Sequence, residues 1–444
     1  MRIFISGDGE SGTYMAKLLS DENQDVIIMG NDEARLENLD ARYNMIVAEG
    51  NPLSVSDLKK AGADKADLFV AVNHRMPVNL TACQLARMAG ARCTVARVDS
   101  GELLEEPSRS FLAGTGVDTM LFPELLAAAE VKMALKVNWA KSWFELHQGL
   151  LTVTAVRLRE TSPLCGLQLK ELASTRRTFH VAAIKRGRDI LIPRGSDTLE
   201  ANDTVYLVTT PEGLPELPGL CGRKPVRIRR VTIAGAGKIS RVTARELAKE
   251  YDVTVIEPDR ELCRRMAETV PAVKIVNADY RNLDVLREEH ADSSDAFIAF
   301  SGSTESNIVS SMVAREFGVP MVIAEIEDTQ YIAEAESLNI DKVINKKLIT
   351  SSHVLRIILG RDINTPQVMS LESACVAEIV VGDRAKVTQR PVRELRLPRS
   401  MTIAGLIRDG HGILVDGDTR IRQGDHVVVV CLNGHLHAIE PLFG

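Results

Sequence analysis

Short apolar runs alternate with amphipathic segments through the first 120 residues of the chain. Runs such as Ile3, Phe4 and Ile5 predict buried strands, and the segments between them have the apolar spacing of helices. This alternation is typical of a parallel sheet with helices on both faces. We predict strands at 2–6, 25–29, 45–48, 68–72 and 93–98, and helices at about 10–21, 32–42, 54–61 and 77–89.

From about residue 150 the pattern becomes β-rich, and the whole plan then occurs a second time. Residues 195–208 resemble residues 417–430, which extends the repeat into the β-rich part. Further strands are expected at 230–234, 252–257, 273–276, 296–300 and 321–325. The predicted fold class is α/β, with two Rossmann-like doubly wound parallel sheets, each followed by a small β-rich α+β domain.

Five segments follow from this plan. A helix with proline in its first turn is expected at 123–135, and residues 211–227 hold four of the 17 prolines of the chain, as expected of a linker. We predict a Rossmann-like domain at 1–122, a linker helix and small domain at 123–210, a linker at 211–227, a second Rossmann-like domain at 228–350, and a linker helix and small domain at 351–444.

A glycine turn follows the first strand of each repeat, as GDGESG at 7–12 and as GAGKIS at 235–240. The first glycine allows the tight turn, the second lets backbone approach a pyrophosphate, and the helix that follows offers free N–H groups to phosphates. The alternative is a purely structural turn. The candidate nucleotide-binding residues are Gly7, Asp8, Gly9, Glu10, Ser11 and Gly12 in the first copy, and Gly235, Ala236, Gly237, Lys238, Ile239 and Ser240 in the second.

An acidic residue that binds ribose hydroxyls is expected at the end of the second strand. The second copy has Glu257 there, whose alternative is a solvated strand-end glutamate. The first copy has Gly30 instead, followed by Asn31 and Asp32 as possible substitutes.

Other candidates stand at the carboxyl ends of later strands, where open α/β sheets bind ligands. Asp279 follows the third strand of the second copy, where the first copy has Gly50 and Asn51; a helix cap is an equal alternative for it. Arg97 ends the fifth strand, either as a phosphate ligand or in a surface salt bridge. The candidates after the fourth strands are Asn73, His74, Ser301 and Gly302.

Composition narrows the possible partners. A net charge of −6 argues against general nucleic-acid binding, and seven scattered cysteines without a CxxC pair indicate reduced thiols in a cytoplasmic protein. The first predicted strand begins at residue 2, and the sequence holds no long apolar run. We therefore expect neither a secretory leader nor a membrane span. The nine histidines show no metal-ligand spacing; His435 and His437 share at most one strand face, and no metal is expected.

These motifs together resemble the TrkA family, the peripheral nucleotide-binding subunits of Trk-type potassium uptake systems. The resemblance covers essentially the whole chain and rests on both glycine turns, VIEPD at 255–259, AFSGSTESN at 299–307, and the order of the modules. It implies tandem RCK (KTN) and TrkA-C domains, binding of NAD(H) and of ATP or ADP, and a ring of four chains. It also implies a cytoplasmic location on a TrkH-type K+-translocating membrane subunit, with contact to the membrane only through that partner.

The chain departs from the family pattern in the first copy, at Gly30, at Asn51 and at residues 75–78. The first copy is therefore expected to bind a different nucleotide, to bind weakly, or to be empty. We assign no catalytic residues and expect a regulator. An NAD-dependent oxidoreductase is the alternative, but the β-rich modules lack an evident proton-donor constellation; a transcription regulator is disfavoured by the acidic charge.

Overall fold

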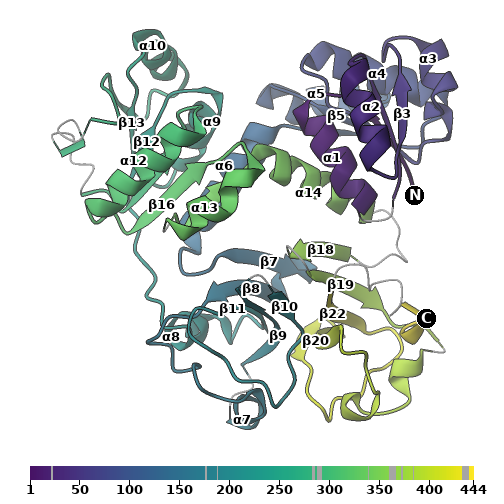
Figure 1. Ribbon diagram of the computed structural model, residues 1–444, viewed down its shortest axis with the longest axis vertical. Helices are drawn as coiled ribbons and strands as arrows, with labels where there is room; N and C mark the ends of the chain where they lie inside the picture. Colours follow the sequence, from purple (N-terminus) through teal and green to yellow (C-terminus); the bar gives the residue numbers. More distant parts are fainter. Residues whose placement is uncertain are drawn as a thin grey trace. The chain divides into compact units, whose positions relative to one another are not determined.

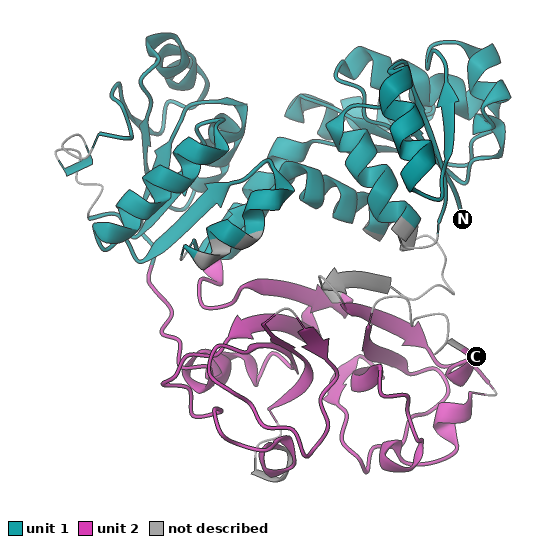
Figure 2. Cartoon of the chain, viewed as in Figure 1, with its two compact units in different colours: residues 1–135, 228–355 teal, residues 136–227, 356–444 magenta. Residues whose placement is uncertain are grey.

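The computed structural model separates the two Rossmann-like segments from the β-rich segments (Figure 2). One compact unit contains residues 1–135 and 228–355, and the other contains residues 136–227 and 356–444. Among the residues described, no helix is long and apolar enough to cross a membrane. The described residues are 1–21, 24–175, 178–187, 189–282, 286–287, 293–338, 340–359, 367–371, 374–383, 385–432 and 440–444.

The first parallel sheet has the strand order β3-β2-β1-β4-β5-β6. Neighbouring residues Phe4 and Ile5 are both fully buried, which shows that both faces of the sheet are covered. A short edge strand, Thr119–Leu121, extends the sheet beyond the five predicted strands. It was not predicted because three residues are too few to show a periodic pattern. The elements are β1 (Arg2–Ser6), α1 (Glu10–Asp21), β2 (Asp25–Gly30), α2 (Glu33–Arg42), β3 (Ile46–Glu49), α3 (Val55–Lys60), β4 (Leu68–Ala71), α4 (Met76–Ala89), β5 (Thr94–Arg97), α5 (Ser108–Gly114) and β6 (Thr119–Leu121).

The second parallel sheet repeats this order as β14-β13-β12-β15-β16-β17. In both sheets the strand order reverses beside the first strand, between β1 and β4 and between β12 and β15. Such a reversal opens a crevice at the carboxyl ends of the strands, directly above the glycine turn. The elements are β12 (Arg230–Ala234), α9 (Lys238–Leu247), β13 (Asp252–Ile256), α10 (Arg260–Thr269), β14 (Lys274–Val276), β15 (Ala296–Ala299), α12 (Thr304–Glu316), β16 (Met321–Glu325), α13 (Ile332–Ser337) and β17 (Lys342–Ile344).

The helix that follows each sheet reaches the other copy (Figure 1). Helix α6 (Pro123–Lys136) comes after the first sheet, but Ala127, Val131 and Leu135 are buried in the core of the second sheet. Helix α14 (Lys346–Leu359) comes after the second sheet, and its Lys347 pairs with Glu10 at the start of α1. The two copies are therefore joined by these two exchanged helices in different ways: α6 packs in the core of the other copy, whereas α14 reaches the other copy through this ion pair and packs Ile349 against the core of its own sheet.

The second unit contains two antiparallel sheets, ordered β10-β9-β11-β8-β7 and β18-β19-β22-β20-β21. The fold class predicted from the sequence is thus confirmed. The elements are β7 (Ser142–Leu146), β8 (Leu151–Arg157), α7 (Leu169–Thr175), β9 (Phe179–Arg186), β10 (Asp189–Leu191), β11 (Thr204–Thr209), α8 (Leu217–Leu220), β18 (Gln367–Leu371), β19 (Ala374–Val380), β20 (Met401–Arg408), β21 (His411–Leu414) and β22 (His426–Leu432).

Both antiparallel sheets contribute to one shared apolar cluster. On β19, Ala374 and Val376 join this shared cluster, whereas Cys375 and Ala377 join the core of their own small domain. The alternation places one face of the sheet against the other small domain. The proline-rich segment expected to be a linker contributes Leu217, through α8, to the core of the first small domain.

Candidate functional site

The glycine turn of the second copy leaves space where a phosphate would lie. Gly235 has a φ of 104°, and a Cβ there would come within 2.3 Å of the Phe300 carbonyl oxygen. Gly237 precedes α9, and nothing lies within 4 Å of the Cβ position. Ser240 is fully buried in α9, where its hydroxyl lies 3.4 Å from the Phe300 carbonyl oxygen. The open side of Gly237 thus leaves room for an anion to approach this helix start.

The turn of the first copy has the same backbone but less space. Gly7 has a φ of 123°, and a Cβ at Gly12 would lie 1.9 Å from the Gly7 carbonyl oxygen. Only glycine fits at both positions. At Gly9, by contrast, a Cβ would be 3.0 Å from Nε2 of His74. The imidazole of His74 thus occupies the side of the turn that is open in the second copy.

In the second copy, Glu257 joins the end of β13 to the glycine turn. Its Oε2 accepts a hydrogen bond of 2.7 Å from the N–H of Ala236, and its Oε1 accepts one of 2.9 Å from the N–H of Asp259. The residue is buried, so the alternative of a solvated strand-end glutamate is excluded for this residue. Asp259 in turn caps α10 with its side chain.

In the first copy the carboxylate comes from the opposite side. Asp8, within the turn, accepts hydrogen bonds of 2.7 Å from the N–H groups of Asn31 and Asp32 at the end of β2. A Cβ at Gly30 would lie 2.2 Å from Cγ of Asp8, so the glycine is required by this carboxylate. Asp32 caps α2 through its side chain, and Asn31 contributes its backbone N–H.

An arginine contacts the turn in each copy, and neither arginine was predicted from the sequence. Arg241 of α9 donates to the Ala236 carbonyl oxygen at 3.1 Å, and Arg35 of α2 donates to the Asp8 carbonyl oxygen at 2.9 Å. Burial and neighbouring arginines lower the pKa of Arg241. No sequence signal marks this pair, because the two arginines come from different helices. Each adds positive charge beside the place expected for phosphates.

The fourth and fifth strands are tied by an asparagine in each copy. Asn79 accepts from the N–H of Asn73 and donates to the Arg97 carbonyl oxygen at 2.9 Å. Asn307 accepts from the N–H of Ser301 and donates to the Glu325 carbonyl oxygen at 2.9 Å. Both asparagines are buried, and they hold the loops that carry the predicted residues.

The remaining predicted residues lie around this frame. Gly302 has a φ of 81° in the turn before α12. Asp279 follows β14 and forms an ion pair of 2.8 Å with Arg281, whose hydrogen bond lowers the pKa of the aspartate. Ser11 lies in α1 and Ile239 in α9, each in the first turn of its helix.

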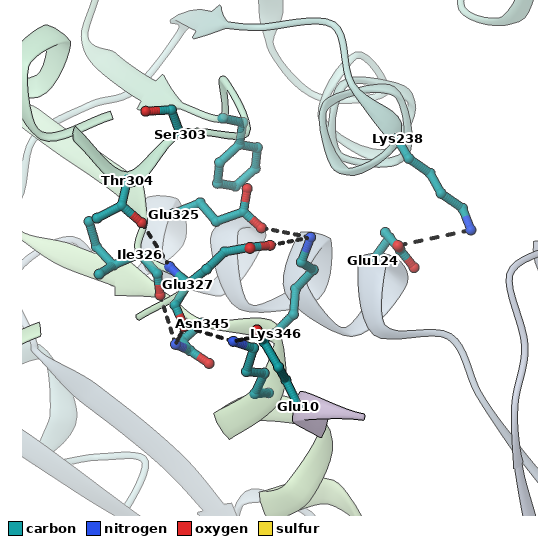
Figure 3. A network of polar contacts seen from close by, with 12 residues as sticks. Glu10, Glu124, Lys238, Ser303, Thr304, Glu325, Ile326, Glu327, Asn345 and Lys346 are labelled. Carbon is teal, nitrogen blue, oxygen red and sulfur yellow. Dashed lines mark hydrogen bonds and ion pairs between the residues drawn. The ribbon is translucent and has the colours of Figure 1, made fainter. Parts of the chain in front are cut away.

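A charged network borders the second site, and the sequence did not reveal it (Figure 3). Buried Glu325 lies 2.9 Å from Nζ of Lys346, which also contacts Glu327 at 3.3 Å. Burial raises the pKa of Glu325, and the ammonium of Lys346 opposes that shift. Nζ of Lys238, in the first turn of α9, lies 3.9 Å from buried Glu124 of α6. The turn of the second copy is thus in contact with the helix that follows the first sheet.

Comparisons with known proteins agree with this arrangement. The TrkA-N domain matches residues 3–123 and 231–346, and the TrkA-C domain matches residues 153–219 and 376–444. Over its whole length the chain is 30% identical to the whole of a Trk system potassium uptake protein TrkA homolog of Archaeoglobus fulgidus. It is 29% identical to the Trk system potassium uptake protein TrkA of Vibrio alginolyticus, covering all of this chain and 98% of that one.

Solved structures show the same fold at low identity. The GsuK RCK domain aligns with a TM-score of 0.60 at 15% identity, covering all of this chain and 94% of that one. The GsuK channel bound to NAD aligns with a TM-score of 0.61 at 14% identity, covering all of this chain and 78% of that one.

Proposed function

The chain belongs to the TrkA family, and from this premise we propose that it is the regulatory subunit of a Trk-type potassium uptake system that senses NAD(H). The ligand acts as a signal and is not transformed. The A. fulgidus and V. alginolyticus relatives are named as potassium uptake proteins.

The second copy is the principal dinucleotide site in this proposal. The observation that carries it is the pairing of Glu257 with an open turn at Gly237. A strand-end carboxylate accepts hydrogen bonds from ribose hydroxyls, and the free N–H groups at the start of α9 receive the pyrophosphate. Arg241 adds positive charge at that point.

The first copy binds NAD(H) more weakly or takes a different adenine nucleotide, such as ATP or ADP. Two features support this assignment. The carboxylate of Asp8 originates within the turn itself and adds negative charge close to the phosphate position. His74 occupies the side of the turn at Gly9.

Regulation follows if the nucleotide binds one conformation of an assembly more tightly than another. A tenfold difference in affinity is worth about 1.4 kcal/mol per site, so several sites in one ring bias its shape strongly. We propose a homotetrameric ring on the cytoplasmic face of a TrkH-type K+-translocating subunit. The exchanged helices α6 and α14 link each site to the other copy and would transmit the change.

The test reconstitutes the chain with its K+-translocating partner in liposomes and measures K+ flux with and without NADH or NAD+. We expect flux to change with nucleotide for the native chain and not for the E257A variant. A chain that binds the partner but leaves flux independent of every nucleotide would contradict the proposal. So would turnover of a nicotinamide substrate, or a monomer by light scattering at micromolar concentration.

A further inference from the structure

Two histidines and a glutamate converge where the two small domains share their apolar cluster. Nδ1 of His426 lies 2.7 Å from Oε1 of Glu378, and Nδ1 of His147 lies 3.1 Å from the same oxygen. The two imidazole rings are 4.9 Å apart, edge to face. The three ligand atoms all lie within 4.8 Å of one another. The residues come from three distant parts of the sequence, which is why histidine spacing predicted no metal site.

The register of the strands fixes two members of this cluster. Glu378 on β19 stands opposite Val428, and His426 at the start of β22 stands opposite Val380. They are diagonal neighbours on the sheet face that carries Val376 and Val428 into the shared cluster. His147 comes from the other small domain, directly after β7, with a φ of 48°.

The carboxylate of Glu378 is incompletely satisfied by these contacts. Its side chain is 5% exposed, and both imidazoles lie against Oε1. Among the described residues, Oε2 has no hydrogen-bond partner although it is buried. A simple hydrogen-bonded trio of neutral histidines and a carboxylate leaves this buried charge poorly compensated, and a cation held beside it would offset that cost.

We propose that His147, Glu378 and His426 bind a divalent transition-metal ion of the Zn2+ type. Two imidazole nitrogens and one carboxylate oxygen are ligands that zinc accepts, with a water in the fourth position. Ca2+ and Mg2+ prefer an all-oxygen shell, so the two nitrogens select against them. Bonds of about 2.1 Å place tetrahedral ligands about 3.4 Å apart. Nδ1 of His147 and Nδ1 of His426, which lie 3.1 and 2.7 Å from Oε1 without a metal, would therefore move outward by about 0.3 and 0.7 Å when the ion binds.

The two histidines also provide the path of entry. Their side chains are 40% and 35% exposed, whereas Glu378 is buried behind them. A bound ion would join the first small domain, through His147, to the second, through Glu378 and His426. The equivalent positions of the first sheet, Ala155 and Thr204, offer neither carboxylate nor imidazole. The repeat therefore generates one such site and not two.

Calorimetric titration of tag-free, chelator-treated full chain with ZnCl2 tests the proposal. We expect one Zn2+ per chain, and at least tenfold weaker binding in E378Q and in H426Q. The matched control is H411Q, because His411 is exposed on β21 and contacts only the Asp409 carbonyl oxygen among the described polar groups. Equal zinc affinity in the native chain and E378Q, or no binding at micromolar concentration, would overturn the proposal.

Substitution by Co2+ identifies the ligands by their absorption. Visible d–d bands without a near-ultraviolet thiolate band support nitrogen and oxygen ligands. A thiolate band would overturn the assignment, because Cys375 and Cys431 lie 2.9 Å apart on the other face of the same sheet. Thermal unfolding provides the folding control: zinc should raise the melting temperature of the native chain and H411Q, and leave E378Q unchanged. Without metal, E378Q must have the same melting temperature as the native chain. If E378Q is less stable, H147Q replaces it in both experiments.

Discussion

The two glycine turns differ in which strand supplies the carboxylate that bonds the turn to its neighbour. In the second copy Glu257 extends from β13 to the N–H of Ala236, and in the first copy Asp8 extends from the turn to N–H groups after β2. Both solutions bond backbone N–H groups beside the same sheet edge: a buried donor at Ala236 in the second copy, and exposed donors at Asn31 and Asp32 in the first. The comparison teaches that duplication kept the backbone and reversed the direction of one side-chain bridge. Only the second arrangement leaves its acid on the strand, where a ribose is expected.

The strongest test of this difference is Gly237→Val. Nothing lies near the Cβ position of Gly237, so the new side chain fills the space assigned to the pyrophosphate without disturbing the protein. We expect at least a hundredfold loss of NAD(H) affinity by calorimetry. The matched variant G9V meets His74 in the first copy and should leave the tight site intact. Equal losses of NAD(H) affinity in G237V and G9V would contradict the assignment of the second copy as the principal site.

Glu257→Ala should produce the next largest effect. It removes the ribose acceptor and one hydrogen bond to the turn. We therefore expect the dissociation constant for NAD(H) to rise tenfold to a hundredfold, a loss of about 1.4–2.7 kcal/mol of binding free energy. D8A, which removes the corresponding carboxylate of the first copy, is the matched control and should leave NAD(H) binding at the second copy unchanged. If E257A binds NAD(H) with native affinity in the same titration, Glu257 is only a structural bridge.

The double variant D8G/G30E moves the carboxylate of the first copy from the turn to the end of the strand, as in the second copy. G30E alone forces a side chain against Asp8 and should lower the melting temperature; D8G removes both the carboxyl group and the Cβ of Asp8, which would lie 2.3 Å from a Cβ at Gly30. We expect the double variant to melt near the native temperature and to bind a second NAD(H) per chain. A stoichiometry that stays at one would show that His74 or another group, and not the carboxylate, limits the first copy.

The smallest effect concerns the contacts of the exchanged helices. Lys238→Glu places a second negative charge beside Glu124 and should cost about 1 kcal/mol of stability, a melting shift of about 2–4 °C by calorimetry. The double reversal E10K/K347E preserves an opposite pair in the first copy and should leave the melting temperature unchanged. A neutral K238E would show that this contact does not stabilise the unit.

Much of the fold could be predicted from the sequence, because strands such as Arg2–Ser6 and Arg230–Ala234 are short, apolar and followed by glycine turns. The edge strand Thr119–Leu121 could not be predicted, because this strand is defined by its pairing with β5 and not by its own composition. Segment Leu217–Leu220 was assigned to a linker from its prolines, yet tertiary packing buries it.

The site was only partly predictable for a similar reason. Glu257 and the glycines follow strands at regular spacing and could be identified one by one. The bridge from Asp8 to the end of β2 could not, because it joins residues more than 20 apart through a contact that only the folded turn creates. The network of Glu325, Lys346 and Glu327 likewise needs β16 and α14 to be placed together. The predicted His435 and His437 lie outside the described residues.

The crossing of α6 also bears on how the two halves of the chain depend on each other. Because Ala127, Val131 and Leu135 complete the interior of the later sheet, the C-terminal half made alone would have an apolar furrow open to water. A nick in the connecting stretch between residues 210 and 228 should accordingly yield two fragments that remain associated. We therefore expect neither half to fold well on its own, although each carries its own parallel sheet and glycine turn.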